Sequence, residues 1–167
     1  MNSSPVTVIP NLSNYLVKKI LWEHYNIEAT VLPLPGERDQ NFLIKATNRK
    51  KFVLKIFNPS ENKLFIDAQN RILHDLTENS ISCPEIIKDI QGNAIIFIDD
   101  FQHPDSWARL STYIEGVPLA EINNYSDSLL TEIGGFLGRL DQRLTQFDHP
   151  AVHRDFYWDI ANGPKIL

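Results

Sequence analysis

The sequence predicts an α+β fold, and two observations carry that prediction. Three short apolar segments typical of β-strands follow one another at 29–34, 41–47 and 52–57, with only tight turns between them. A stretch with helical periodicity comes next, and two more strand-like segments follow at 94–99 and 107–114. Because consecutive strands with short links pair side by side, we expect a five-stranded antiparallel sheet with one helix inserted after the third strand.

Apolar side chains at helical spacing predict three helices, over 12–25, within 58–80 and over about 126–147. Their apolar faces consist of Leu16, Val17, Ile20 and Leu21 in the first, Phe65, Ile72 and Leu76 in the second, and Leu129, Ile133, Phe136, Leu137, Leu140, Leu144 and Phe147 in the third. The third helix also contains Gly134, Gly135 and Gly138, which permit close approach of another backbone and so predict a closely packed partner element.

Composition limits the class of protein. A chain of 167 residues that is 43% hydrophobic can bury the core of one ordinary globular domain. No apolar run approaches the roughly 20 residues that span a bilayer, and the start MNSSPVTVIP does not resemble a signal peptide, so we expect a cytoplasmic protein without a membrane partner. A net charge of -5 without a basic block argues against nucleic acid as a partner. Cys83 is the only cysteine, which excludes an internal disulfide.

Lys55 stands out because its neighbours in FVLKIF are all apolar. Strand alternation places it on the same side as Val53 and Phe57. It is either an edge-strand lysine whose amine reaches water along an apolar stem, or a lysine held to meet phosphate oxygens. Gln69 favours the second interpretation: it lies in the apolar stripe of the following helix, where an amide needs a partner, and we expect it to face Lys55. The alternative for Gln69 is a bond to backbone or water.

Two connecting segments add weaker signals. The turn PGERDQNF links the first two strands and holds one glycine, Gly36. Asp39, Gln40 and Asn41 are expected to tighten this turn through side-chain-to-backbone hydrogen bonds. The segment LSTYIEG then ends the last strand at Gly116. Taken alone, the first is an ordinary turn and Gly116 is an ordinary strand-terminating glycine, and only their positions in the order of elements give them meaning.

Taken together, the segments GERDQNF, FVLKI, IDAQNRILHDL, CPEII, LSTYIEGVPL, GGFLGRLDQRL and FDHPA…YWDIAN resemble the aminoglycoside phosphotransferase and choline kinase superfamily, whose fold is protein-kinase-like. The resemblance covers about residues 12–167. It is strongest to the hydroxylysine kinase group and to the kinase-like domains fused to class III aminotransferases. It implies a nucleotide-binding lobe with a leading helix over 1–111, a hinge over 112–118 and the start of a truncated second lobe over 119–167.

The resemblance also implies a nucleotide site. Lys55 would contact the α- and β-phosphates, and Gln69 would replace the glutamate that many kinases carry there. The turn would form the phosphate loop and the hinge backbone would hold the base, through Gly36, Glu37, Asp39, Gln40, Asn41, Thr112, Tyr113 and Ile114. The nucleotide would be ATP or GTP with Mg²⁺, and the acceptor would be a hydroxyl of a small amino compound, hydroxylysine-like or aminoglycoside-like.

The segment HRDFYWDIAN, residues 153–162, is close to the kinase catalytic-loop pattern H-R-D-x-x-x-x-N. Six residues instead of four separate Asp155 from Asn162, so we interpret the match as a coincidence. The base aspartate and the magnesium ligands are expected beyond Leu167. No catalytic or metal-binding residue is therefore predicted in this chain, which alone should be inactive. Without the missing lobe, the helix at 126–147 should expose its apolar face, and a homodimer through residues 129–160 is expected.

Two other interpretations stay open. The chain is also consistent with the kinase-like domain of a multidomain class III aminotransferase, in which case pyridoxal phosphate would serve another domain. A non-catalytic, pseudokinase-like binding module is the second alternative. Gln69 and the single-glycine turn favour such a module, whereas Lys55 counts against it, because a buried charge is costly unless an anion matches it.

Overall fold

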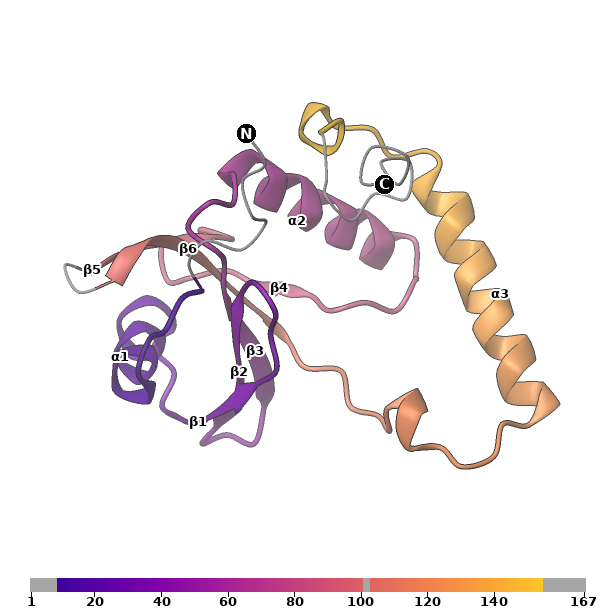
Figure 1. Ribbon diagram of the computed structural model, residues 1–167, viewed down its shortest axis with the longest axis horizontal. Coiled ribbons are helices and arrows are strands. Elements are labelled where there is room, and N and C mark those ends of the chain that lie inside the picture. The colour runs from indigo at the N-terminus through magenta and orange to yellow at the C-terminus, as the bar shows by residue number, and fades with distance from the viewer. Residues whose placement is uncertain (1–8, 101–102, 155–167) are drawn as a thin grey trace, which may run out of the picture.

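The computed structural model describes residues 9–100 and 103–154 (Figure 1). Within these residues the elements in chain order are α1 (Asn14–Tyr25), β1 (Ala29–Leu34), β2 (Gln40–Ala46), β3 (Lys51–Ile56), α2 (Lys63–Glu78), β4 (Ile86–Ile87), β5 (Ile96–Asp100), β6 (His103–Thr112), the short 3-10 helix η1 (Leu119–Glu121), α3 (Asp127–Leu144) and a second 3-10 helix, η2 (Pro150–Val152). All strand pairs are antiparallel, which confirms the predicted α+β class.

The sheet has the strand order β1-β2-β3-β6-β4, and β5 also pairs with β6. The long strand β6 therefore organises the sheet: β3 lies along one edge, and β5 and β4 share the other. The five predicted strands are present, with bounds shifted by a few residues. The two-residue strand β4, which pairs Ile86 with Ser111 and Ile87 with Leu110, was not predicted because two residues show no alternation.

The main core lies between α1 and one face of the sheet. Every second residue of β3 points into it, and Phe52, Leu54 and Ile56 are all buried. Val17 and Leu21 of α1 meet them from the other side and are fully buried. Burying each such side chain stabilises the fold by about 1.5–3 kcal/mol. The intervening residues of β3, Lys55 among them, therefore point to the opposite face.

The opposite face of the sheet carries α2, so that the two helices lie on different sides of the sheet (Figure 1). A smaller cluster forms here from buried Phe57, Ile66 and Ile95, with Trp107 packed against it. The stripe predicted for this helix is rotated. Leu76 is buried as expected, but Phe65 and Ile72 are only half-buried, and Ile66 and Ala68 point inward instead. The helix is rotated because Gln69 and Asn70 of α2 face an arginine of β6, which is described below.

The helix α3 stands apart from the sheet, at the end of an extended connection that follows β6 (Figure 1). Its last turn is joined to α2 by an ion pair in which Arg143 Nε donates to Asp75 Oδ2 at 2.6 Å. None of its residues is buried. Of the predicted apolar face, Leu137 and Leu144 are 50% and 37% exposed and the other five residues are half-buried, so this face is only partly open. No described helix is long and apolar enough to cross a bilayer.

The closely packed partner expected beside the glycines of α3 is not found among the described residues. A Cβ atom added at Gly134 or Gly138 would meet nothing within 4 Å, and at Gly135 it would meet only the guanidinium of Arg139, at 3.5 Å. These glycines therefore make no close backbone contact within 9–100 and 103–154.

Candidate functional site

Lys55 forms an ion pair with Asp39 of the turn between β1 and β2. The distance from Lys55 Nζ to Asp39 Oδ2 is 2.7 Å, and the two side chains are 31% and 21% exposed. The ammonium also lies 5.1 Å from the centroid of the Phe57 ring, which confirms that Lys55 and Phe57 share one side of the sheet. The charge is thus held over an apolar surface but remains within reach of a ligand.

The turn is folded down onto the end of β3 by hydrogen bonds. Asp39 Oδ1 accepts from the backbone N–H of Asn58 at 2.8 Å, and the buried Asn58 side chain donates to the carbonyl of Arg38 at 3.2 Å. Within the turn, Asn41 Nδ2 donates to the carbonyl of Pro35 at 3.2 Å, which confirms that Asn41 tightens it. The turn and the strand that carries Lys55 therefore form one unit.

Gly36 is required by close packing inside this turn. A Cβ atom there would lie 2.1 Å from the carbonyl oxygen of Asp39 and 2.7 Å from Asn41 Nδ2, far inside van der Waals contact. A single glycine is therefore enough to let the turn close over β3. Glu37, next to it, is exposed to solvent.

Gln40 has a different role from the one predicted. Its Oε1 accepts from the N–H of Leu12 at 2.8 Å, and its Nε2 donates to the carbonyl of Leu12 at 3.0 Å. The expectation that its side chain tightens the turn was wrong, because alternation along β2 points it to the α1 side of the sheet. Only the backbone of Gln40 is left for a ligand at the turn.

The expected contact between Lys55 and Gln69 is not formed among the described residues. Arg109 of β6 takes the place of Lys55: its Nη1 donates to Asn70 Oδ1 at 2.8 Å and to Gln69 Oε1 at 3.4 Å. The planar guanidinium presents several donors at once and so satisfies two amides of α2, whereas the shorter ammonium turns to Asp39. Gln69 does face this side of the sheet, but its partner is Arg109.

Arg109 is a residue of this candidate site that sequence reasoning missed. The register of the β3–β6 pair places it directly opposite Lys55. Its signal was available, since Ala108 and Leu110 on either side of it are apolar and fully buried. Burial lowers the pKa of Arg109 to about 10, and the attraction of Asp39 opposes that shift. The guanidinium stays charged at neutral pH.

The end of β6 and the residues that follow it divide their backbone groups between hydrogen bonds within the protein and solvent. The N–H of Thr112 donates to the carbonyl of Glu85 at 2.9 Å, and the N–H of Tyr113 donates to the carbonyl of Lys51 at 3.2 Å. Within the described part of the chain, the peptide groups of Ile114 have no partner, and its side chain is 51% exposed. Of the three residues predicted to contact a base, Ile114 is the one whose N–H is available.

The phosphotransferase enzyme family matches residues 30–165 of this sequence, a span that includes the turn, Lys55 and Arg109. The chain belongs to this family. It is 30% identical to hydroxylysine kinase of Danio rerio over 94% of the chain and 47% of that protein. It is 31% identical to hydroxylysine kinase of Bos taurus over 81% of the chain and 40% of that protein. The chain therefore spans about half the length of the curated relatives it matches.

Solved structures similar to this phosphotransferase-family chain agree on the fold. One is an amicoumacin kinase in complex with AMP-PNP, Ca²⁺ and Ami, with a TM-score of 0.73 and 17% identity over 89% of this chain and 46% of that one. Another is a microcompartment-associated aminopropanol kinase, with a TM-score of 0.65 and 16% identity over 90% of this chain and 46% of that one. The sheet with its inserted helix is thus a kinase-like small lobe, as predicted.

Arg154 of the HRD segment packs against the start of α2. Its Nη1 donates to Glu61 Oε1 at 2.7 Å, and its guanidinium lies 3.5 Å from the centroid of the Phe65 ring. The preceding His153 lies 2.5 Å from Asp148. Asp155 to Asn162 fall outside the described residues, so the interpretation of this segment as a coincidental match stays a prediction.

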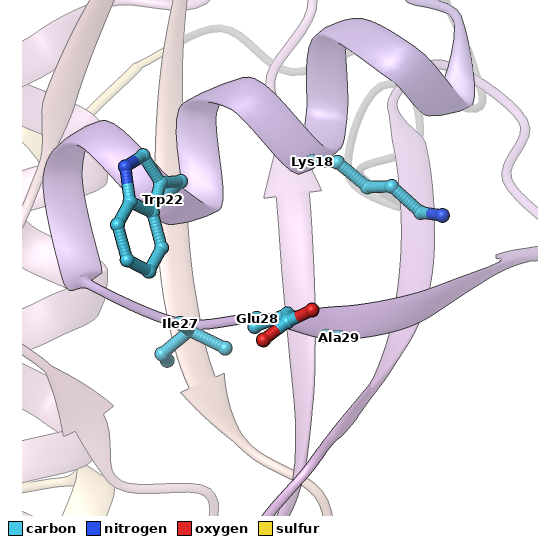
Figure 2. A pocket seen from close by; sticks show the side chains of 5 residues that line it. All are labelled: Lys18, Trp22, Ile27, Glu28 and Ala29. Atoms are coloured by element: carbon cyan, nitrogen blue, oxygen red, sulfur yellow. The ribbon is translucent and has the colours of Figure 1, made fainter.

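An open depression of about 380 Å³ lies between α1 and the start of β1, lined by Lys18, Trp22, Ile27, Glu28 and Ala29. Its side chains do not converge: Figure 2 shows the amine of Lys18 turned away from the Trp22 ring. This depression shares no residue with the surroundings of Lys55.

Proposed function

We propose that this chain is the nucleotide-binding part of a small-molecule kinase, which transfers the γ-phosphoryl group of ATP or GTP to a hydroxyl of a small amino compound. The observation that carries the proposal is the position of Lys55, a charged side chain on the central strand β3 beneath a tight glycine turn. Membership of a phosphotransferase family supports it, and relatives that are hydroxylysine kinases support the class of acceptor. A structural neighbour bound to AMP-PNP supports a nucleotide.

In this proposal residues 1–111 form the nucleotide lobe, 112–118 form the hinge, and 119–167 begin the second lobe. The turn between β1 and β2 closes over the phosphates and includes Gly36, Glu37, Asp39, Gln40 and Asn41. The hinge holds the base through the peptide groups of Ile114 and the carbonyls of Thr112 and Tyr113. Gln69 serves indirectly, because it orients Arg109.

The described residues contain no cluster of three or more His, Cys, Asp or Glu that could hold a metal ion. The proposal therefore assigns nucleotide binding to these residues and no part of the metal chemistry. The catalytic base and the magnesium ligands are assigned to the half of the relatives' length that this chain does not span.

Titration of the chain with AMP-PNP and with the corresponding GTP analogue, followed by thermal shift and calorimetry, tests the proposal. Lys55→Met should weaken binding at least about tenfold, because a charge-assisted hydrogen bond to phosphate contributes roughly 1.5–3 kcal/mol. Lys45→Met is the matched control, since Lys45 is an exposed lysine on β2 and its loss removes the same charge. No stabilisation of the unchanged chain by either nucleotide, or equal losses for both variants, would overturn the proposal.

A further inference from the structure

Arg109 and Lys55 form a pair of cations on one face of the sheet. They are direct partners in the antiparallel register of β3 and β6, so their Cβ atoms are about 4.5–5.5 Å apart. The ring of Phe57 serves both, because Lys55 Nζ and Arg109 Cζ each lie 5.1 Å from its centroid. Two like charges directly opposite each other destabilise a strand pair unless an anion compensates them.

The chain itself supplies only part of that compensation. Asp39 is the one carboxylate that contacts either cation in the described residues, and it pairs with Lys55. The hydrogen-bond partners of Arg109 are the neutral amide oxygens of Gln69 and Asn70, which orient the guanidinium without balancing its charge. The lowered pKa of Arg109 agrees with this, since burial lowers it and the attraction of Asp39 does not restore it. The group therefore carries one excess positive charge.

Arg109 also has donors to spare. Its Nη1 makes both bonds to α2, whereas Nε and Nη2 make no hydrogen bond within the described residues. The planar edge of a guanidinium matches the geometry of a phosphate group. Asn70 leaves its own Nδ2 buried without a partner in order to present its oxygen to Arg109, so this part of α2 is built around the arginine.

We infer that Arg109 is the second cation of the phosphate site: its free Nε and Nη2 edge binds a phosphate oxygen of the nucleotide next to Lys55, while Nη1 stays on α2. The inference rests on the proposed nucleotide binding and adds a residue to that site. It gives α2 a direct link to the bound phosphate through one side chain, at a position where this helix offers Gln69 and Asn70 and no carboxylate. The competing role is a purely structural anchor between β6 and α2.

Comparing affinity for a triphosphate with affinity for its nucleoside separates the two roles. Calorimetry measures the binding of AMP-PNP and of adenosine to four proteins: the full chain, Arg109→Gln, Arg109→Lys and the charge control Lys45→Met. If the chain prefers GTP, the GTP analogue and guanosine are used instead. Arg109→Gln keeps a polar contact to the amides of α2 but removes the charge. It should lose at least about tenfold in affinity for the triphosphate and less than about twofold for the nucleoside.

Arg109→Lys keeps the charge but loses the planar donor edge, so it should lose about three- to tenfold in affinity for the triphosphate and less than about twofold for the nucleoside. It keeps the inference testable even if Arg109→Gln does not fold, because an unchanged affinity of Arg109→Lys for the triphosphate would contradict it. Equal losses for nucleoside and triphosphate in Arg109→Gln, or no loss at all, would show a structural anchor and overturn the inference alone. A folded, unchanged chain that binds neither nucleotide would overturn the proposed function itself and the inference with it.

Discussion

The carboxylate of Asp39 joins the side chain of Lys55 to the backbone of Asn58. One oxygen lies 2.7 Å from Lys55 Nζ, and the other accepts from the Asn58 N–H at 2.8 Å. The turn between β1 and β2 thus places its own anion at the position where a phosphate would meet the lysine. A phosphate that approaches Lys55 competes with Asp39.

Asp39→Asn should therefore strengthen binding of a nucleoside triphosphate. Asparagine retains an oxygen for the N–H of Asn58 but removes the competing charge. We expect affinity to rise by about three- to tenfold, and the free energy of unfolding to fall by no more than about 1 kcal/mol, because the ion pair is partly exposed. Calorimetry and thermal unfolding measure the two effects. Weaker binding by a variant with unchanged stability would show that Asp39 assists the phosphate instead.

Gly36→Ala tests whether the shape of the turn matters. Its Cβ atom would lie 2.1 Å from the carbonyl oxygen of Asp39, so the turn must open and Asp39 must leave Lys55. We expect a loss of about 1–3 kcal/mol in unfolding free energy, together with weaker nucleotide binding.

Gly116→Ala is the matched control for that substitution. A Cβ atom at Gly116 meets nothing within 4 Å, and its φ is not positive. The variant should be neutral, or more stable by up to about 1 kcal/mol, since alanine restricts the unfolded chain. If both glycine variants behave alike, the packing argument for Gly36 is wrong.

The sequence carried the fold because its strands alternate strongly. In β3, the apolar residues Phe52, Leu54 and Ile56 fill the core and leave Lys55 on the other face, as alternation requires. The strand β4 could not be predicted, because its two residues are too few to show alternation. They form a strand only by pairing with β6. Local patterns therefore predicted elements, and tertiary pairing added the remainder.

The candidate site was predicted in its main cation and not in the partners of that cation. Lys55 was visible as one charge in an apolar strand, but its choice between Asp39 and Gln69 depends on the distances between three separate elements. Arg109 forms the hydrogen bonds to the amides of α2 because it lies on β6, next to β3, and carries more donors than Lys55. Periodicity gives the face of a side chain, whereas the identity of its partner follows from the assembled sheet.

The ion pair between Asp75 and Arg143 should make the attachment of α3 to α2 pH-dependent. The hydrogen bond from Arg143 lowers the pKa of Asp75 below its ordinary value of 3.8, and partial burial opposes the shift. A carboxyl with a depressed folded-state pKa stabilises the fold above its unfolded-state pKa. That contribution disappears as the pH falls through the lower, folded-state value.

Thermal unfolding as a function of pH checks this expectation. The unchanged chain should be more stable than Asp75→Asn above about pH 4, and the difference should shrink below that value and vanish once the pH is below the folded-state pKa of Asp75. Asp67→Asn removes the same charge at another position of α2. Asp67 makes no ion pair with the described residues, so this variant should show no such dependence. A constant difference between the chain and Asp75→Asn at every pH would contradict the role of the ion pair.

The outer side of α3 should make the chain associate with itself. Leu130, Leu137 and Leu144 are 52%, 50% and 37% exposed, and their spacing of seven places them in one row along the helix. One of the two core positions of a coiled coil recurs at this spacing, so we expect the row to pack against a second copy in a dimer that forms as concentration rises. Leu137→Glu puts a charge at the middle of the row and should abolish the association while α3 stays helical.

Gln142→Glu is the control for this substitution. It adds the same charge to an exposed polar position of α3 and should leave the association unchanged. Light scattering and sedimentation over a range of concentrations measure the association of both variants and of the unchanged chain. An unchanged chain that stays strictly monomeric at high concentration would contradict the prediction.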